Sequence, residues 1–319
     1  MLQMKVEAPA KLNLHLQIGD RRPDGFHDIE SLFAALVWGD TLSFEIFSKP
    51  QALEICMDWQ PLEALFAGGF PAIPPEKNII SRAVSLFRSR TGYEEGLKIT
   101  VEKRIPLGGG LGGGSSDAAA TLLALNRLAS GDKSPVSDAA LAEMGASLGS
   151  DVPFFLHAAT EAAWVTGRGE VIQPLELPES ARNLSIVLIN PGFSSDTTEA
   201  YHLFDVWRGK NPPILPKDSA LLLKSLSSPP HDWPFSNDFL TVFRAAAEES
   251  PSMSGTFTTY QTIISDLREQ GADFAGLSGS GSTCFGVFSG REKAELARKN
   301  LAVYWPFVVD TFLLARQAI

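Results

Sequence analysis

The sequence predicts a protein of the α+β class with two domains. The chain has 319 residues, and with roughly 100–200 residues in a typical domain this length favours two of them. Residues 11–18 alternate strictly between apolar and polar, which indicates a strand close to the N-terminus. The other predicted strands and helices follow in a mixed order, rather than in the regular β-α alternation of a doubly wound sheet.

The alternating segment separates two kinds of side chain. Its apolar face comprises Leu12, Leu14, Leu16 and Ile18, and its polar face comprises Lys11, Asn13, His15 and Gln17. Such alternation is typical of a strand with one face on the core and the other in solvent, so we expect a half-buried strand. Lys11 and Asn13 lie on the same face and can therefore enter one site, although a solvated sheet face is an equally good interpretation of the spacing alone.

Further segments have the pattern of strands or of helices. Strands are expected over residues 41–47, 97–103, 184–190, 283–288 and 307–314. Helices are expected between Asn78, a favourable N-cap, and Gly92, a favourable stop, from Ser115 onward, and over about 138–148, 239–249, 257–270 and 291–303. The domain boundary is expected near residue 165, before the turn Gly167-Arg168-Gly169, which gives domains of 1–165 and 166–319.

Composition narrows the class of function. The formal net charge is −10, from 27 basic and 37 acidic residues, which argues against a nucleic-acid partner. The two cysteines, Cys56 and Cys284, form no C-x-x-C pair, as expected in a reducing compartment. No stretch approaches the roughly 18 apolar residues of a membrane span. We therefore expect a cytoplasmic protein with neither a nucleic-acid nor a membrane partner, and this composition does not exclude an anionic small ligand.

The strongest local signal is a glycine-rich segment. Six of the seven residues 108–114 are glycine, and the segment lies between the strand predicted over 97–103 and the helix predicted from Ser115. Glycine is costly inside a packed strand or helix, so this is a loop. A loop of unencumbered N–H groups beside a helix N-terminus is a recurring way to bind phosphate. The alternative interpretation, a flexible linker, does not explain the close framing by a strand and a helix.

Three common phosphate-loop patterns do not fit. The P-loop has Lys after its last glycine, where this chain has Ser115. The dinucleotide pattern is matched by Gly108, Gly110 and Gly113, but no strand ending in an acidic residue follows about 20 residues later. A protein-kinase glycine loop is followed by a valine-containing strand, whereas a helix is predicted here.

The segment from Pro106 to Ser116 resembles the ATP loop of the superfamily of galactokinase, homoserine kinase and mevalonate kinase, the GHMP kinases. Four other blocks narrow the resemblance to the family of 4-diphosphocytidyl-2-C-methyl-D-erythritol kinases. They are Pro9-Ala-Lys-Leu-Asn-Leu14, Arg21-Arg-Pro-Asp-Gly-Phe-His27, Leu148-Gly-Ser-Asp-Val-Pro-Phe154 and Gly276-Leu-Ser-Gly-Ser-Gly-Ser282. The blocks occur in the family's order and span nearly the whole chain.

The resemblance implies a fold and a reaction. The expected fold is an N-terminal domain similar to ribosomal protein S5 domain 2 and a C-terminal ferredoxin-like domain, with the active site in the cleft between them. The expected reaction transfers the γ-phosphoryl group of ATP to the 2-hydroxyl of the cytidyl-diphospho substrate, a step of the non-mevalonate route to isoprenoids. Mg²⁺ is expected to be carried by ATP, and the protein is expected to be a monomer or weak homodimer.

The resemblance also implies residue roles. Lys11 and Asp151 are expected to be catalytic, with Lys11 as a cation for the phosphoryl group and Asp151 as the acceptor of the hydroxyl proton. The expected substrate-binding residues are Asn13, Phe26, His27, Thr197 and Tyr201. The expected ATP-binding residues are Pro106, Leu107, Gly108, Gly109, Gly110, Leu111, Gly112, Gly113, Gly114, Ser115, Ser116, Lys103 and Asn78, with Ser115 or Ser116 as a candidate ligand of Mg²⁺.

Several alternatives remain open at this point. Asp151 follows a probable helix end and is also a plausible N-cap, and Ser115 or Ser116 is a plausible cap of the following helix. Phe26 stands where the family usually has Tyr, which keeps the stacking face and loses a hydroxyl. Residues 205–262 match the family poorly. The competing functions are another GHMP-type kinase, for homoserine or mevalonate, and a non-catalytic sensor of ATP and ligand.

Overall fold

The computed structural model describes residues 3–66, 69–130, 136–157, 161–212, 217–249 and 251–314. The chain forms two compact units. The first contains Met1–Ala10, Trp38–Leu107 and Gly112–Thr160, and the second contains Lys11–Val37, Gly108–Leu111 and Glu161–Ile319. Strands β1 (Gln3–Arg21) and β2 (His27–Phe47) therefore contribute to both units. The α+β class is confirmed, and the predicted boundary near residue 165 stays a prediction.

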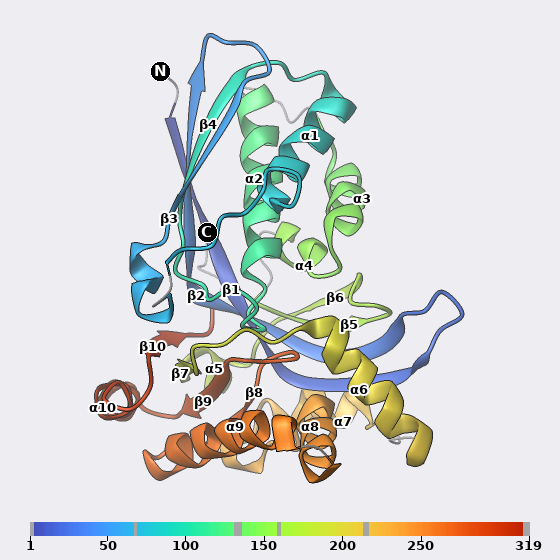
Figure 1. Cartoon of the computed structure of the whole chain (residues 1–319), viewed down its shortest axis with the longest axis vertical. Helices are drawn as coiled ribbons and strands as arrows, with labels where there is room; N and C mark the ends of the chain where they lie inside the picture. Colours follow the sequence, from blue (N-terminus) through green and yellow to red (C-terminus); the bar gives the residue numbers. More distant parts are fainter. Residues whose placement is uncertain are drawn as a thin grey trace. The chain divides into compact units, whose positions relative to one another are not determined.

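The first unit is a sheet with helices on one side (Figure 1). Strand β4 (Gly96–Glu102) lies between two neighbours: it pairs antiparallel with residues 41–47 of β2 and parallel with β3 (Leu53–Asp58). The helices are α1 (Ile79–Thr91), α2 (Gly113–Ser130), α3 (Asp138–Leu148) and α4 (Val152–Leu156), with a 3-10 turn, η1, at Gln60–Leu65. The apolar face of β4 (Leu97, Ile99, Val101) is fully buried against this layer.

Helix α1 shows how local sequence sets element ends in this unit. The side chain of Asn78 accepts a hydrogen bond from the amide of Ile80 at 2.9 Å, which caps the helix N-terminus. Gly92 ends the helix in the left-handed conformation with φ of 70°, which costs glycine little. Both predicted ends of this helix are confirmed.

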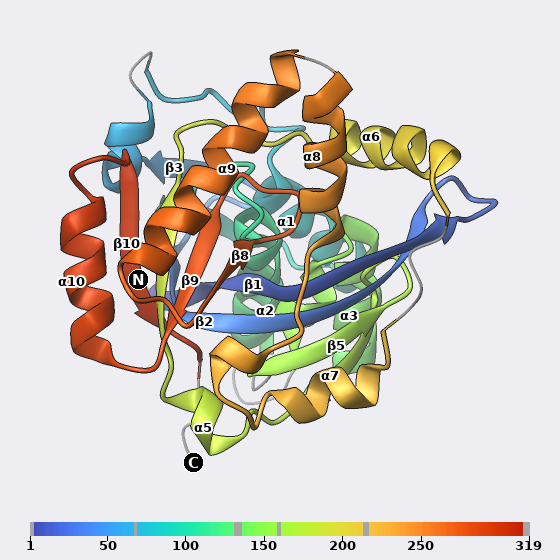
Figure 2. The same cartoon turned by 90° about the horizontal axis from the view of Figure 1, so that it is seen from below.

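The second unit contains a four-stranded antiparallel sheet in the order β10-β7-β9-β8. Its strands are β7 (Ser185–Asn190), β8 (Phe274–Leu277), β9 (Cys284–Phe288) and β10 (Phe307–Phe312). Helices α9 (Pro251–Glu269) and α10 (Arg291–Leu301) pack on these strands, and α8 (Asp238–Glu249) packs on α9 (Figure 2). Two helices crossing a four-stranded antiparallel sheet agree with the expected ferredoxin-like arrangement.

The second unit also holds a smaller strand group and several short helices. Residues 31–34 of β2 pair with β5 (Ala162–Thr166), and β5 pairs with β6 (Val171–Leu175). The helical segments are α5 (Glu179–Arg182), α6 (Thr197–Lys210), α7 (Ser219–Ser225) and the 3-10 turn η2 (Pro230–Asp232). The poorly matching segment 205–262 thus contains the last part of α6, all of α7 and α8, and much of α9.

The expectation of a half-buried strand at residues 11–18 was wrong. The strand forms as predicted, but all four polar side chains are buried with the apolar ones, between 0 and 5% exposed. The polar face is covered because Ser236 contacts it: its amide donates to Nδ1 of His15 at 3.1 Å, and its carbonyl accepts from the amide of Leu16 at 2.8 Å. The alternation in the sequence shows only which side chains are polar. Whether the polar face is buried depends on contacts with a segment some 220 residues later in the chain.

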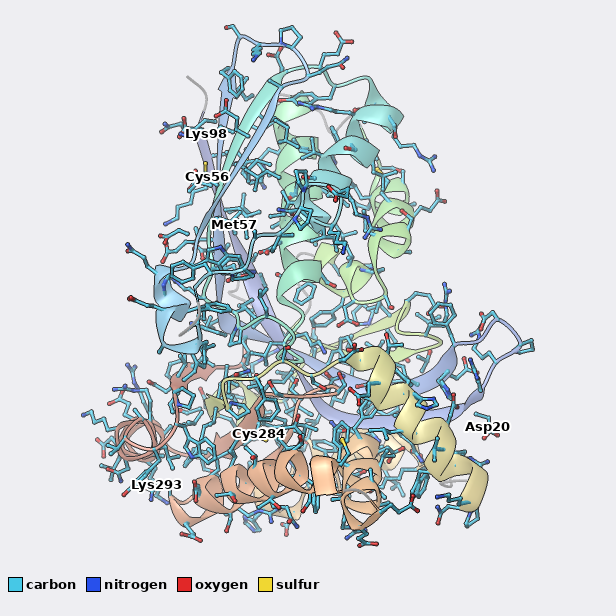
Figure 3. The ribbon with its side chains drawn as sticks, viewed as in Figure 1. Asp20, Cys56, Met57, Lys98, Cys284 and Lys293 are labelled. Carbon is cyan, nitrogen blue, oxygen red and sulfur yellow. The ribbon has the colours of Figure 1, made fainter. Side chains whose placement is uncertain are left out.

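Two features of composition can be checked in the structure. Cys56 on β3 is exposed and Cys284 on β9 is buried, and both are free thiols (Figure 3). Within the described ranges, no helix is both long and apolar enough to cross a membrane.

Candidate active site

In the second unit, four successive carbonyl oxygens of the glycine-rich loop are held by hydrogen bonds. The donors come from β1, from the segment before α6, and from the turn between β8 and β9. They are the amide of Ser195 to Gly108 (3.0 Å), the amide of Thr283 to Gly109 (3.1 Å), the hydroxyl of Ser278 to Gly110 (2.8 Å) and the amide of Lys11 to Leu111 (3.0 Å). Among the described residues, none accepts a hydrogen bond from the amides of 108–111. Fixed carbonyls on one side leave N–H groups for an anion on the other.

The loop requires glycine at particular positions. Gly108 and Gly110 have φ of 60° and 75°, a region that side chains with a Cβ rarely adopt. A Cβ on Gly110 would lie 2.0 Å from the carbonyl oxygen of Ser278, and one on Gly108 would lie 2.7 Å from Cβ of Ser194. Fixed carbonyls and close backbone approach are properties of an ordered binding loop, and they disfavour the linker interpretation.

In the first unit, α2 begins two residues earlier than predicted, at Gly113. A Cβ on Gly113 would lie 2.9 Å from Cγ2 of Ile105, so glycine lets the helix start pack against the end of the preceding strand segment. Ser115 is half-buried. The hydroxyl of Ser116 is fully buried and has no hydrogen-bond partner among the described residues, so it does not cap the helix. Of the two serines, Ser115 is the less buried, and its predicted contact with a phosphate or a cation stays a prediction.

Lys103 lies at the end of β4 in a buried group of charges. Its ammonium contacts the carboxylate of Asp40 and lies 2.7 Å from Oδ2 of Asp117, and all three side chains are at most 4% exposed. Burial would lower the pKa of Lys103, but the two carboxylates raise it overall. Burial raises the pKa of Asp117 to about 7. Both carboxylates engage the ammonium of Lys103 within the chain. The predicted contact of Lys103 with ATP stays a prediction.

Lys11 and Asn13 form one polar cluster in the second unit. Nζ of Lys11 donates to Oδ1 of Asn13 at 2.5 Å and lies 4.7 Å from the centre of the Phe33 ring. Nδ2 of Asn13 donates to the hydroxyl of Ser31 at 2.9 Å. The hydroxyl of Ser278 accepts from the amide of Asn13 at 3.2 Å and also donates to Gly110. The structure thus brings these two predicted residues together and connects them to the glycine loop.

Asp151 lies in the first unit, directly before α4. The preceding helix α3 ends at Leu148, and Gly149 follows it as predicted. Asp151 occupies the N-cap position of α4, but its side chain makes no capping hydrogen bond and its backbone is helical rather than extended. A capping side chain normally accepts from an amide in the first turn. The capping interpretation is therefore wrong, and the catalytic interpretation of this half-buried carboxylate remains a prediction.

His27 and Tyr201 are brought together in the second unit. Their rings stack with centres 5.3 Å apart and planes 17° from parallel. Nδ1 of His27 lies 3.0 Å from the carbonyl oxygen of Gly19, and Nε2 lies 3.1 Å from Oδ1 of Asp205. Both neighbours are acceptors, so both contacts are hydrogen bonds only when each ring nitrogen carries a proton. Both nitrogens of this ring are therefore engaged within the chain.

Phe26 and Thr197 are the remaining predicted substrate contacts. Phe26 is 55% exposed, and the guanidinium of Arg168 lies over its ring at 4.9 Å. Thr197 begins α6, and its hydroxyl lies 3.0 Å from the hydroxyl of Ser280. Phe26 therefore presents an aromatic surface to solvent, whereas Thr197 belongs to the group of hydroxyls around the turn at Ser280.

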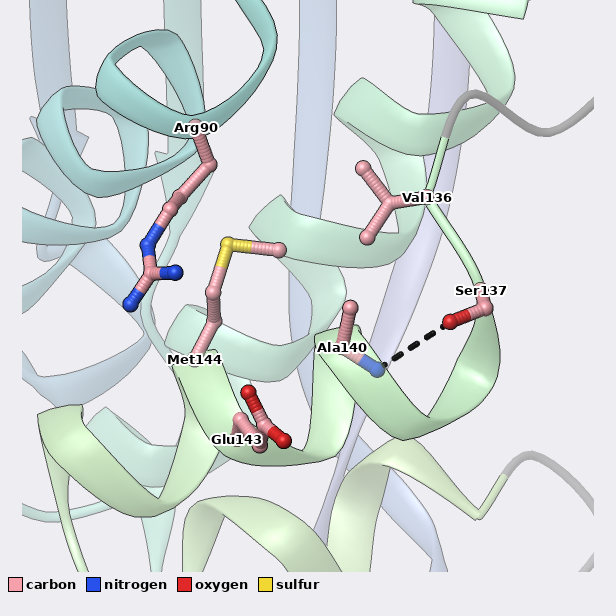
Figure 4. A pocket seen from close by; sticks show the side chains of 6 residues that line it. All are labelled: Arg90, Val136, Ser137, Ala140, Glu143 and Met144. Atoms are coloured by element: carbon pink, nitrogen blue, oxygen red, sulfur yellow. Dashed lines mark hydrogen bonds between the residues drawn. The ribbon is translucent and has the colours of Figure 1, made fainter.

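A surface pocket occurs elsewhere in the first unit, between α1 and α3 (Figure 4). It is lined by Arg90, Val136, Ser137, Ala140, Glu143 and Met144. The hydroxyl of Ser137 caps α3 by accepting from the amide of Ala140 at 3.3 Å. None of the residues predicted for the active site lines this pocket.

The sequence analysis missed several residues that hold the site. Ser195 and Ser278 fix the glycine loop, Asp205 engages His27, and Asp40 and Asp117 engage Lys103. Ser278 and Asp117 lie in or next to blocks that were singled out, so they could have been examined. Asp40 and Asp205 stand in stretches without a motif, and only the fold brings them to their partners.

Two models of known protein domains match parts of the chain. Residues 78–159 match the GHMP kinases N terminal domain, and residues 244–306 match the GHMP kinases C terminal domain. The fold is also similar to a homoserine kinase from Cytophaga hutchinsonii, with a TM-score of 0.62, 17% identity, and coverage of 98% of this chain and 95% of that one. A likeness at that identity shows the fold alone.

Closer relatives share a narrower name. The 4-diphosphocytidyl-2-C-methyl-D-erythritol kinase of Thermodesulfovibrio yellowstonii is 34% identical over 311 residues, covering 96% of this chain and 97% of the relative. That of Xanthomonas axonopodis pv. citri is 35% identical, covering 92% and 85%. A crystal structure of 4-(cytidine 5'-diphospho)-2C-methyl-D-erythritol kinase superposes with a TM-score of 0.74 and 32% identity, covering 97% and 98%. Since these matches extend over nearly the full length of both partners, the chain belongs to the family of 4-diphosphocytidyl-2-C-methyl-D-erythritol kinases and is a small-molecule kinase.

Proposed function

We propose that this protein transfers the γ-phosphoryl group of ATP to the 2-hydroxyl of 4-diphosphocytidyl-2-C-methyl-D-erythritol, in the non-mevalonate route to isoprenoid precursors. The observation that carries the proposal is the glycine loop, whose carbonyls at 108–111 are held on one side while its amides are unused among the described residues. The acceptor is the substrate for which the near-full-length relatives are named.

ATP would be held mainly by the protein backbone. The loop amides donate to phosphate oxygens, and the N-terminus of α2 adds the positive end of a helix dipole. Mg²⁺ bound with ATP would neutralise phosphate charge, and the half-buried hydroxyl of Ser115 fits as its ligand, whereas the buried hydroxyl of Ser116 does not. Asn78 and Lys103 are proposed to lie near the adenine, with Asn78 also capping α1.

Lys11 and Asp151 are proposed to act on the reacting groups. Phosphoryl transfer asks little covalent chemistry of a protein, so positioning and charge neutralisation supply most of the acceleration. Lys11, whose orientation is set by Asn13 and Phe33, would stabilise negative charge on the transferring group. Asp151, whose side chain does not cap α4, would orient the substrate hydroxyl and accept its proton.

Cytosine recognition is proposed to use stacking more than the His27 ring nitrogens. Gly19 and Asp205 engage both nitrogens, so a contact of His27 with the base would use its main chain. The exposed ring of Phe26 offers a stacking face, and Tyr201 would supply the second aromatic surface. Thr197 and Asn13 would contribute polar contacts to the rest of the substrate.

The decisive experiment is a product assay. The protein is incubated with Mg·ATP and 4-diphosphocytidyl-2-C-methyl-D-erythritol, and a new phosphomonoester is sought by phosphorus NMR. Homoserine and mevalonate are tested in parallel, and cytidine diphosphate is tested as a competitor. Phosphorylation of homoserine or mevalonate in place of the cytidyl compound would contradict the proposal. Tight binding of both ligands without turnover would instead favour a sensor.

A further inference from the structure

The buried charges around Lys103 do more than pair with one another: they connect the two chain segments that flank the glycine loop in the first unit. One ammonium lies between two carboxylates, Asp40 and Asp117, and none of the three side chains is more than 4% exposed. Lys103 directly follows strand β4, on the N-terminal side of the glycine loop, which we call the strand side. Asp117 lies in the early turns of α2, on the C-terminal side of the loop, which we call the helix side. Asp40 belongs to β2.

Asp40 organises the strand side. Its Oδ1 accepts from the amides of Arg104 at 2.5 Å and of Ile105 at 2.8 Å, while its Oδ2 contacts the ammonium of Lys103. The backbone leaving β4 is therefore fixed in direction by one carboxylate. Because Lys103 is the residue before these two amides, Asp40 holds both its side chain and the backbone that directly follows it.

Asp117 organises the helix side. Its Oδ2 accepts from the ammonium of Lys103 at 2.7 Å, and its carbonyl accepts from the hydroxyl of Thr121 one turn later at 2.7 Å. Helix α2 begins at Gly113, four residues before Asp117, and in its first turn Gly114 is exposed and Ser115 is half-buried. The Lys103–Asp117 bond thus joins helix α2 to the segment that contains Arg104 and Ile105.

Fold stability alone does not account for Asp117. The group carries one more carboxylate than ammonium, and Oδ1 of Asp117 is buried with no hydrogen-bond partner among the described residues. A buried carboxylate that is only partly satisfied is costly. An apolar residue at this position would leave Lys103 paired with Asp40 and would avoid that cost.

We propose that Asp117 is a positioning residue of the ATP site, acting through Lys103 to hold the first turn of α2 in register with the strand side of the glycine loop. The expected effect of Asp117 on the KM for ATP rests on the proposed function. The other part of the inference, that Asp117 fixes the two segments flanking the loop, applies to the protein without ligand.

Asp117→Ala tests the proposal, and Asp117→Asn is its matched control. The alanine variant removes the connection and leaves a neutral Lys103–Asp40 pair, so the protein should remain folded. The asparagine variant keeps an acceptor oxygen in place for the ammonium. We expect Asp117→Ala to raise the KM for ATP about 10-fold, with kcat and the KM of the cytidyl substrate within about two-fold of wild type. Asp117→Asn should stay within about three-fold for ATP.

Hydrogen exchange of the ligand-free protein provides the second measurement. Amides of residues 104–107 and 112–116 should exchange faster in Asp117→Ala than in wild type or Asp117→Asn. If these amides exchange faster in Asp117→Ala but the wild-type protein does not use ATP, the proposed function fails while the structural part of this inference stands. Unchanged exchange and unchanged KM for ATP in Asp117→Ala would overturn it, and so would equal losses in both variants, which would assign the effect to charge.

A further variant keeps the proposal testable if Asp117→Ala does not fold. Lys103→Met/Asp117→Asn keeps the buried formal charge at its original value and removes the connection. It should reproduce the faster exchange of the two flanking segments in the ligand-free protein, a measurement that does not depend on any direct contact of Lys103 with ATP. A folded double variant with wild-type exchange would also overturn the proposal.

Discussion

The carbonyl oxygen of Ser278 lies 2.0 Å from the point that a Cβ on Gly110 would occupy. The same serine donates its hydroxyl to the carbonyl oxygen of Gly110 at 2.8 Å. The glycine loop and the turn between β8 and β9 thus approach so closely that only a residue without a side chain fits. This contact ties the anion-binding geometry of the loop to a segment that follows it by about 170 residues.

Gly110→Ala should therefore weaken ATP binding while the protein stays folded. The new methyl group would push the loop away from Ser278 and would also require a strained φ of 75°. We expect the dissociation constant for ATP, measured by calorimetry, to rise at least about 10-fold. Gly209→Ala on α6 is the matched control, because its Cβ would meet nothing within 4 Å. Normal ATP affinity in Gly110→Ala would contradict the assignment of the loop.

Asp151→Asn should lower turnover without removing either ligand. The change is nearly isosteric and does not disturb a cap, since the Asp151 side chain makes no capping hydrogen bond. General-base assistance typically contributes about 10²–10⁴-fold, so kcat should fall by that range while both dissociation constants stay close to wild type. Asp138→Asn, on an exposed residue of the same unit, is the control for a general effect of lost charge. Turnover of Asp151→Asn within a few-fold of wild type would rule out the base assignment.

Tyr201→Ala should impair binding of the cytidyl substrate selectively. The substitution removes a ring that stacks on His27 and packs edge-on against Phe239. Base stacking on an aromatic ring is worth about 1–3 kcal/mol, so the KM for the cytidyl substrate should rise about 10-fold or more while the KM for ATP is unchanged. Tyr201→Phe keeps the stacking ring and should raise the KM for the cytidyl substrate much less than Tyr201→Ala does. An equal rise of both KM values in Tyr201→Ala would show that the residue is structural.

The local features of this fold could be predicted from the sequence, whereas the long-range features mostly could not. The ends of α1, the bounds of α3 and the existence of the glycine loop depend on capping residues and glycines within a few positions, and these were predicted. Strands β3, β5, β6 and β8 were missed, because each is only four to six residues long and is too short for a sustained alternation.

Prediction of the candidate site was limited in the same way. The resemblance in short blocks identified Lys11, Asp151 and the loop as candidates, because those residues lie inside the blocks. The residues that orient them were not found, since Ser195 and Asp205 act on partners that lie 87 and 178 positions earlier in the chain. Single-sequence patterns contain no information about such pairs. Burial of the polar face of β1 was missed for the same reason.

The last prediction concerns acid stability and His15. This side chain is fully buried, and its Nδ1 accepts from the amide of Ser236, so the neutral ring carries its proton on Nε2, which has no hydrogen-bond partner among the described residues. Burial, and after it the charge of Lys217, lowers the pKa of His15 from 6.5 to about 4. The unfolded chain therefore binds more protons than the folded one between these values. Stability from this group is fully present above about pH 6.5 and is lost as the pH falls toward 4.

The measurement is the free energy of unfolding by urea at pH 7 and pH 5, for wild type and His15→Gln. Wild type should lose about 2 kcal/mol more than the variant over this interval. Asp238, whose pKa burial raises to about 6, acts in the opposite direction, but it does so in both proteins and cancels in the difference. His231→Gln is the control, because that exposed side chain should leave the pH dependence as in wild type. Parallel pH profiles for wild type and His15→Gln would show that the His15 ring is protonated as easily in the folded protein as in the unfolded chain.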